Sequence, residues 1–107
     1  MTLKQFSEIT EWQRKTFPKA TVLTTVSHLE EEMEELKLAL DSDDTGLSVR
    51  EEFADCFILL FGAAATYGLT YDSIVELIDK KMEINYARKW GEPKENGVVN
   101  HIKEESK

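Results

Sequence analysis

Four carboxylates stand in two pairs of equal spacing, Glu32-x-x-Glu35 and Glu52-x-x-Asp55, with sixteen residues between the pairs. Residues three apart lie on one face of an α-helix, so each pair presents its oxygens together. Carboxylates without histidine or cysteine among them suit a hard divalent cation such as Mg²⁺ or Mn²⁺. Asp55 also precedes an uncharged stretch, 56–71, where a carboxylate is costly to desolvate without a cation. The spacing predicts one metal site shared by two helices.

The glutamates of the run 30–35 are not equivalent. A turn of about 100° per residue places Glu32 and Glu35 beside the apolar stripe that we expect to face the core, which is Leu29, Met33, Leu36 and Leu40. The same rotation turns Glu30, Glu31 and Glu34 farther out, where we expect a solvated helix face. Asp55 alone has a second explanation, a position near the positive end of a helix dipole, but this does not account for four carboxylates.

The next helix has the same periodicity. Its core face is expected to consist of Phe53, Phe57 and Leu60, with Glu52 and Asp55 on a flank beside Leu59. Antiparallel packing would bring the two acidic flanks together.

A basic segment follows on a later helix. An apolar stripe that begins at Ile74 continues on nearly the same face as Lys81, Asn85 and Arg88. An ammonium, an amide and a guanidinium at these spacings are typical of a phosphate clamp. The alternative is that Lys81 and Arg88 lie along the surface or pair with the acidic helices.

Aromatic residues and histidines supply candidates for contact with a flat heterocycle, although aromatic residues at helical spacing are also typical of core. The candidates for base binding are Trp12, Phe17, His28, Trp90 and His101, and Tyr86 is a further aromatic of this kind. Neither histidine has metal-ligand spacing, and His101 lies where a tail residue would act in a lid. Cys56 has no activating base nearby in sequence, so we expect a buried structural thiol.

Periodicity and capping signals predict four helices to carry these residues. Thr2 and Ser48 each open a capping box, Pro18 stops the first helix, and Gly68 ends the third, which is apolar almost all round and expected to be central. The expected bounds are 2–17, from 21–27 to about 40, 48–68 and 70–90, with an irregular tail over 91–107. Short loops favour antiparallel neighbours, so the expected fold is one all-α domain over 1–107, an antiparallel four-helix bundle.

Composition excludes several classes of partner. A net charge of −8 over 107 residues disfavours nucleic acid and anionic membranes, because both repel an acidic protein. A single cysteine forms no internal disulfide, and no secretory signal pattern opens the chain, so a reducing cytoplasm is expected. The longest apolar run, 56–65, is far too short to span a membrane.

These motifs together resemble the all-α nucleoside triphosphate pyrophosphohydrolases of the MazG type. The family pattern Glu-Glu-x-x-Glu, a spacer and Glu-x-x-Asp is matched without departure by Glu31-Glu32-x-x-Glu35 and Glu52-x-x-Asp55. Segments 12–18, 28–29, 81–91 and 96–102 are similar to one branch, the small and often phage-encoded dATP/dGTP diphosphohydrolases. This resemblance covers nearly the whole chain.

The resemblance implies a role for each matching residue. Glu32, Glu35, Glu52 and Asp55 would ligate about two or three Mg²⁺ ions, for which Mn²⁺ would substitute. Glu31 would support them, and Glu32 or Glu35 would take a proton from water. Lys81 and Arg88 would bind the triphosphate, and Asn85 would contact metal or phosphate. The implied reaction converts dATP or dGTP to the monophosphate and pyrophosphate in a homodimer or homotetramer that completes the bundle, in the host cytoplasm if the chain is phage-encoded.

Other functions fit parts of the same pattern. The nearest are a dCTP, dUTP or phosphoribosyl-ATP pyrophosphohydrolase of the same superfamily, because base choice rests on pocket residues. From a different class, an acidic helical interaction module without catalysis would use the same charge run. A di-iron carboxylate bundle is disfavoured, because such sites use Glu-x-x-His and neither histidine stands three residues after a glutamate.

Overall fold

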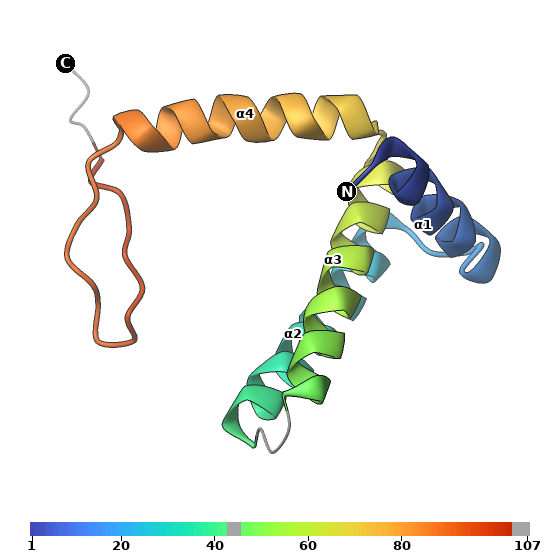
Figure 1. Ribbon diagram of the computed structural model, residues 1–107, viewed down its shortest axis with the longest axis horizontal. Coiled ribbons are helices and arrows are strands. Elements are labelled where there is room, and N and C mark those ends of the chain that lie inside the picture. Colours follow the sequence, from blue (N-terminus) through green and yellow to red (C-terminus); the bar gives the residue numbers. More distant parts are fainter. Residues whose placement is uncertain (43–45, 104–107) are drawn as a thin grey trace. The chain divides into compact units, whose positions relative to one another are not determined.

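The computed structural model describes residues 1–42 and 46–103, and the described chain is all-α as predicted. Its helices are α1 (Leu3–Thr16), α2 (Val22–Asp41), α3 (Leu47–Tyr67) and α4 (Tyr71–Ala87) (Figure 1). The chain divides into two compact units, Met1–Tyr71 with α1 to α3 and Asp72–Lys107 with most of α4 and the tail. Each unit is described by itself.

Threonine side chains start the first two helices. Thr2 Oγ1 accepts a hydrogen bond from the Gln5 backbone N–H at 3.1 Å, which confirms the predicted start of α1. α2 begins after Thr21, whose hydroxyl accepts from the Thr24 N–H while Thr24 Oγ1 accepts from the Thr21 N–H. This reciprocal capping satisfies two donors that the first turn leaves unpaired.

Glycines bound α3 at both ends. The prediction that Ser48 caps α3 is wrong, because the helix begins at Leu47, so Ser48 already lies in its first turn. The chain enters α3 through Gly46, whose φ of 77° lies in the left-handed region. At the other end Gly68 has a φ of 114°, and the Leu69 N–H bonds to the Ala64 carbonyl at 3.0 Å, a Schellman arrangement that confirms the predicted stop.

α2 and α3 pack side by side and antiparallel, as Figure 1 shows. The face of α3 that packs is not the predicted one: Leu59 is 6% exposed, whereas Phe53, Phe57 and Leu60 are 45–58% exposed. On α2, likewise, Met33 and Leu40 of the expected core stripe are exposed.

The packed faces lie about one residue around each helix from the predicted ones. The buried and half-buried positions on α3 include Val49, Glu52, Cys56, Leu59, Gly62 and Ala63, and those on α2 include His28, Leu29, Glu32, Leu36 and Ala39. Small side chains such as Gly62 and Ala63 let neighbouring helices approach closely, which a face of phenylalanines does not. One carboxylate of each acidic pair, Glu32 and Glu52, is therefore half-buried at the helix interface, and the large apolar residues Phe53, Phe57 and Leu60 of α3 stay exposed.

α1 packs on the second half of α3 through Gln13 and a ring contact. Phe6 and Phe61 meet edge to face with ring centroids 5.9 Å apart. Gln13, which is 8% exposed, donates from Nε2 to the Ile58 carbonyl oxygen at 2.9 Å. Its amide lies over Gly62, where a Cβ atom would come 1.9 Å from Gln13 Oε1. The absence of a side chain at Gly62 therefore allows α1 to pack on α3 at this point.

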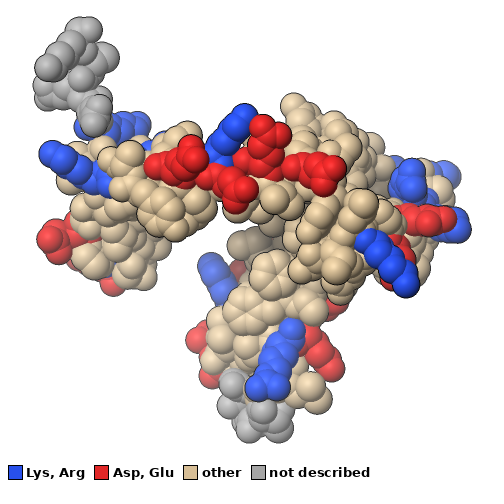
Figure 2. All heavy atoms as spheres, turned by 45° about the horizontal axis from the view of Figure 1, so that its top comes forward, with Lys and Arg blue, Asp and Glu red and all other residues tan. Residues whose placement is uncertain are grey.

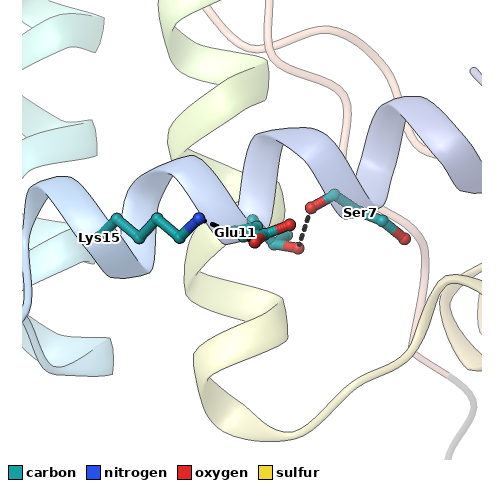
Figure 3. Close-up of polar contacts among 4 residues, drawn as sticks. Ser7, Glu11 and Lys15 are labelled. Atoms are coloured by element: carbon teal, nitrogen blue, oxygen red, sulfur yellow. Dashed lines mark hydrogen bonds and ion pairs between the residues drawn. The ribbon is translucent and has the colours of Figure 1, made fainter.

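The outer face of α1 is solvated. Lys15 Nζ lies 3.0 Å from a Glu11 carboxylate oxygen one turn earlier, on a face shown in close-up in Figure 3. The hydrogen bond from Lys15 lowers the pKa of Glu11. An exposed pair of this kind contributes little to stability, so α1 is held by its Phe6 and Gln13 side.

α4 and the tail form the second unit. α4 ends at Ala87, three residues before the predicted end near Trp90. The Arg88 N–H bonds to the Ile84 and Asn85 carbonyls, which tightens the last turn, and Trp90 pairs with His101 in an isolated antiparallel bridge. The tail is not simply irregular. It leaves α4, turns at Gly97 and returns, as Figure 1 shows.

No single helix of the described chain is long and apolar enough to cross a membrane. α3 and α4 meet that requirement of length and composition only when they are counted together across the break between them.

The contact between Gln13 and Gly62 generates a prediction on stability. Gly62→Ala should lower the free energy of unfolding by about 1–3 kcal/mol, because the new methyl group displaces the Gln13 amide from its hydrogen bond. Denaturant unfolding followed by circular dichroism measures this loss.

The matched control is the same substitution in a Gln13→Ala background. There the methyl group meets no amide, and alanine is a better helix former than glycine by up to about 1 kcal/mol. Gly62→Ala should then be neutral or stabilising. An equal loss in both backgrounds would mean that Gln13 does not determine the need for glycine.

Candidate functional site

Three of the four predicted metal ligands meet between α2 and α3. One carboxylate oxygen each from Glu32, Glu52 and Asp55 lies within 4.8 Å of the other two. Glu32 comes from the middle of α2, whereas Glu52 and Asp55 come from the first half of α3, one turn apart. The antiparallel pairing of α2 and α3 creates this cluster, as the spacing predicts.

Two oxygens of the cluster are buried without a donor. Among the described residues, no hydrogen-bond donor reaches Oε2 of Glu32 or Oε2 of Glu52. A buried carboxylate oxygen without a partner is strongly unfavourable unless a proton or a cation meets it. The donor set is made only of hard oxygen atoms, so the site suits a divalent cation such as Mg²⁺ or Mn²⁺.

The close approach of the carboxylates changes their affinity for protons. The pKa of Glu32 is raised to about 7, first by the hydrogen bond that a shared proton makes with Glu52, then by burial, and then by Glu35. Two carboxylates in contact cannot both stay ionised without a compensating charge. A metal-free site therefore holds a proton near neutral pH, and a cation would replace it.

The remaining glutamates of α2 are all exposed, and only Glu35 acts on the pKa of Glu32. Glu35 lies beside Glu32, close enough to raise the pKa of Glu32, but it is exposed and stands outside the set of three. Glu30, Glu31 and Glu34 are exposed, in agreement with a solvated face.

His28 and Cys56 border the cluster. His28 Nε2 lies 3.5 Å from a Glu32 carboxylate oxygen, one turn before it on α2. Burial and then Glu32, Glu52 and Asp55 raise the pKa of the Cys56 thiol, which is half-buried beside them. The thiol is thus kept protonated, as expected for a structural cysteine.

A cavity of about 900 Å³ opens next to His28 within the Met1–Tyr71 unit. This volume is in the range of small-molecule sites, roughly 300–1,000 Å³. Phe17 and His28 line the cavity with their rings edge to face, 6.3 Å between centroids, and Trp12 packs behind Phe17 at 5.7 Å. The predicted base-binding residues Phe17 and His28 are therefore brought together at a cavity, one helical turn from the acidic cluster.

The phosphate-clamp residues lie in the other unit. Lys81 is exposed on α4, while Asn85 and Arg88 are half-buried, with Arg88 Nη1 donating to Asn85 Oδ1 at 3.4 Å. Trp90 and His101 stack edge to face with ring centroids 6.0 Å apart. Asn85 and Arg88 are thus linked by a hydrogen bond, and Trp90 and His101 by a ring contact.

Some residues of the site carry no chemical signal in the sequence. Arg14 and Thr25 line the cavity beside Phe17 and His28, yet arginine and threonine on a helix surface are ordinary. The approach of Gln13 to Gly62 also forms part of the cavity wall. The one sequence feature that points to this contact is Gly62 itself, because an isolated glycine inside a helical pattern often has a packing reason.

Comparison with known proteins agrees with this geometry. Residues 5–107 match the model of the dATP/dGTP pyrophosphohydrolase family. Among solved structures, the chain is similar to the cyanophage S-2L MazG-like pyrophosphohydrolase bound to dGDP and three catalytic Mn²⁺ ions per active site. The two share 30% sequence identity over 96% of this chain and 99% of the other, with a TM-score of 0.75. No curated protein matches the chain.

The match to the family spans both compact units, and the solved relative has the same all-α architecture over nearly its whole length. The carboxylate cluster supplies the hard oxygen ligands that a divalent metal requires. On sequence and fold together, the chain belongs to the dATP/dGTP pyrophosphohydrolases, metal-dependent MazG-like enzymes that act on deoxynucleoside triphosphates.

Proposed function

We propose that the chain hydrolyses dATP and dGTP to the monophosphate and pyrophosphate at a Mg²⁺ centre formed by Glu32, Glu35, Glu52 and Asp55. The observation that carries this proposal is the meeting of three carboxylates from two helices, with two buried oxygens that no protein donor reaches. In the S-2L relative, three Mn²⁺ ions occupy each active site, which supports more than one ion here.

Glu32, Glu52 and Asp55 would hold the metal, and exposed Glu35 would complete the set from the solvent side. A bound divalent cation would neutralise phosphate charge and acidify a water molecule. Glu35 is exposed and Glu32 is half-buried beside it, so either carboxylate is placed to accept a proton from that water. Glu31 is exposed one position from Glu32 and would add negative charge in support.

The cavity beside His28 is proposed to take the purine base. Phe17 and His28 offer ring surfaces, and Trp12 supports Phe17 from behind. The bound dGDP of the S-2L relative supports a purine preference. Trp90 and His101 stay candidates for base contact on the strength of the sequence motif alone.

Lys81, Asn85 and Arg88 are proposed to bind the phosphates, with Arg88 oriented by its bond to Asn85. A homodimer or homotetramer is proposed because Phe53, Phe57 and Leu60 form an exposed apolar face of α3 that no described residue of the Met1–Tyr71 unit covers. We also propose a cytoplasmic location, because this substrate class suits it. The location would be the host cytoplasm if the chain is phage-encoded.

The reaction itself is the first test. With Mg²⁺ present, dATP and dGTP should yield the monophosphate and pyrophosphate in equal amounts, and excess chelator should abolish turnover until Mg²⁺ or Mn²⁺ is restored. Ion-exchange chromatography of the products, over a panel of nucleotides at equal concentration, measures this. Orthophosphate as primary product would refute the proposed cleavage, and a ten-fold preference for dCTP would refute the purine assignment.

The carboxylates should divide by position. Glu35→Gln, Glu52→Gln and Asp55→Asn should each lower kcat by at least about two orders of magnitude, because a lost metal ligand removes several kcal/mol of charge stabilisation. Glu30→Gln and Glu34→Gln are matched controls on the exposed face of α2 and should change kcat less than about two-fold. A similar loss in a control would mean that overall charge, rather than the cluster, sets the rate.

The raised pKa of Glu32 predicts how the stability of the metal-free protein depends on pH. Between pH 4.5 and about 7 the folded state binds more protons at Glu32 than the unfolded state, so the free energy of unfolding falls as pH rises through this window. Glu32→Gln should remove that fall. The chelated variant should therefore melt above the wild type at pH 8 and level with it at pH 4.

Thermal unfolding in chelator from pH 4 to 8 measures this difference, which separates Glu32 from the other carboxylates of the chain. Metal binding below pH 7 should also release a proton, detected as a buffer-dependent heat by calorimetry. A difference between variant and wild type that does not vary with pH would contradict the shared-proton interpretation.

A further inference from the structure

A second cleft, of about 720 Å³, lies within the Asp72–Lys107 unit at the C-terminal end of α4. Four of its lining residues can carry positive charge and the other three are apolar. They are Arg88, Lys89, His101 and Lys103, with Ile84, Ala87 and Ile102.

Backbone hydrogen bonds of the returning tail build this cleft. The Ile102 N–H donates to the Lys89 carbonyl at 2.6 Å, and the Gly91 N–H donates to the Asn100 carbonyl at 2.8 Å. The Trp90 ring, stacked on His101, also donates from Nε1 to the Asn85 carbonyl at 3.1 Å. Residues thirteen or more positions apart, Arg88 and His101, therefore line one cleft because the tail is tied to the end of α4.

The charge of the cleft is positive over the residues that the structure describes. No aspartate or glutamate of the described chain lines it, and within the described part of this unit none of Arg88, Lys89 and Lys103 is ion-paired. Figure 2 shows mainly acidic side chains along α4, with a basic one among them, and both basic and acidic side chains over the tail. In a protein of net charge −8, a local group of cations with no ion-pair partner among the described residues is the opposite of the average surface.

The dipole of α4 offers a simpler explanation for part of this group. Basic residues are favoured near helix C-termini, where carbonyl groups lack partners. This accounts for Arg88 and Lys89, which follow the helix directly. It does not account for a tail that is hydrogen-bonded in place so that His101 and Lys103 join them.

We propose that this cleft is a polyphosphate-binding site in which Lys89, His101 and Lys103 act together with Arg88. Several cations around a cleft of this size fit a small anion with adjacent phosphates, because charge-assisted hydrogen bonds concentrate on it. Extended polyanions such as nucleic acid are repelled by the rest of the chain. The choice of pyrophosphate as ligand rests on the proposed function, which releases that anion.

Binding of inorganic pyrophosphate to the full-length protein in excess chelator tests the site. Without metal the acidic cluster repels anions, so binding reports on the cleft. In ¹H–¹⁵N NMR spectra the amides of Lys89, His101 and Ile102 should shift, while those of Glu32, Glu52 and Asp55 stay in place. Lys103→Glu should weaken pyrophosphate binding at least ten-fold, and His101→Phe, which keeps the ring contact with Trp90, about three-fold or more.

Lys94→Glu is the matched control, because Lys94 lies in the same tail, is exposed and does not line the cleft. It should weaken binding less than about three-fold. Equal losses for Lys94→Glu and Lys103→Glu, no effect of His101→Phe, or shifts at the acidic cluster alone would each overturn the proposal. Hydrolysis of dATP is measured separately, so turnover without pyrophosphate binding at the cleft refutes only this site. Binding at the cleft without turnover refutes only the proposed function.

Discussion

The contact between carboxylates of α2 and α3 is the constraint on which the Met1–Tyr71 unit depends. Glu32 and Glu52 face each other in the packed interface of two helices, with oxygens that no protein group satisfies. Such an arrangement opposes folding until a proton or a cation enters. The helices must then be held together by other contacts, so that the site exists before its metal arrives.

Those other contacts lie at the opposite end of α3. Leu59 and Ala63 are buried there, Phe6 meets Phe61, and the Gln13 amide lies over Gly62. The absence of a Cβ atom at Gly62 lets α1 approach and leaves the cavity beside Phe17 and His28 bounded by three helices. The small-residue face of α3 thus provides both the stabilising contacts and room for the cavity. The first half of the same helix carries the carboxylates that repel each other.

The Asp72–Lys107 unit is held together by a different kind of contact. Its described part carries little buried apolar surface, and its order comes from hydrogen bonds between the end of α4 and the returning tail. Trp90 connects the end of α4 to the returning tail, because its indole N–H donates to the Asn85 carbonyl while its ring and its backbone both pair with His101. The cations at the helix end are gathered as a result, and a binding surface is formed without a conventional core.

The sequence alone determined the local features, because these rest on interactions within a few residues. Backbone geometry accounts for the start of α1 after Thr2, for its counterpart, the stop of α3 at Gly68, and for the i, i+3 carboxylate pairs. The family motif identified the chemistry. Only the tertiary structure decided which face of α3 packs. That helix is apolar almost all round, so periodicity does not distinguish Phe53, Phe57 and Leu60 from the smaller face around Leu59 and Ala63.

The same limit applies to the residues that act across long separations. Gln13 and Gly62 are forty-nine positions apart, and nothing local in either segment shows that one amide will occupy the space of the missing side chain. His101 returns to Trp90 through backbone bonds that depend on the turn at Gly97. Spacing along the chain shows which groups share a helix face, whereas close packing between helices decides which of those faces meet.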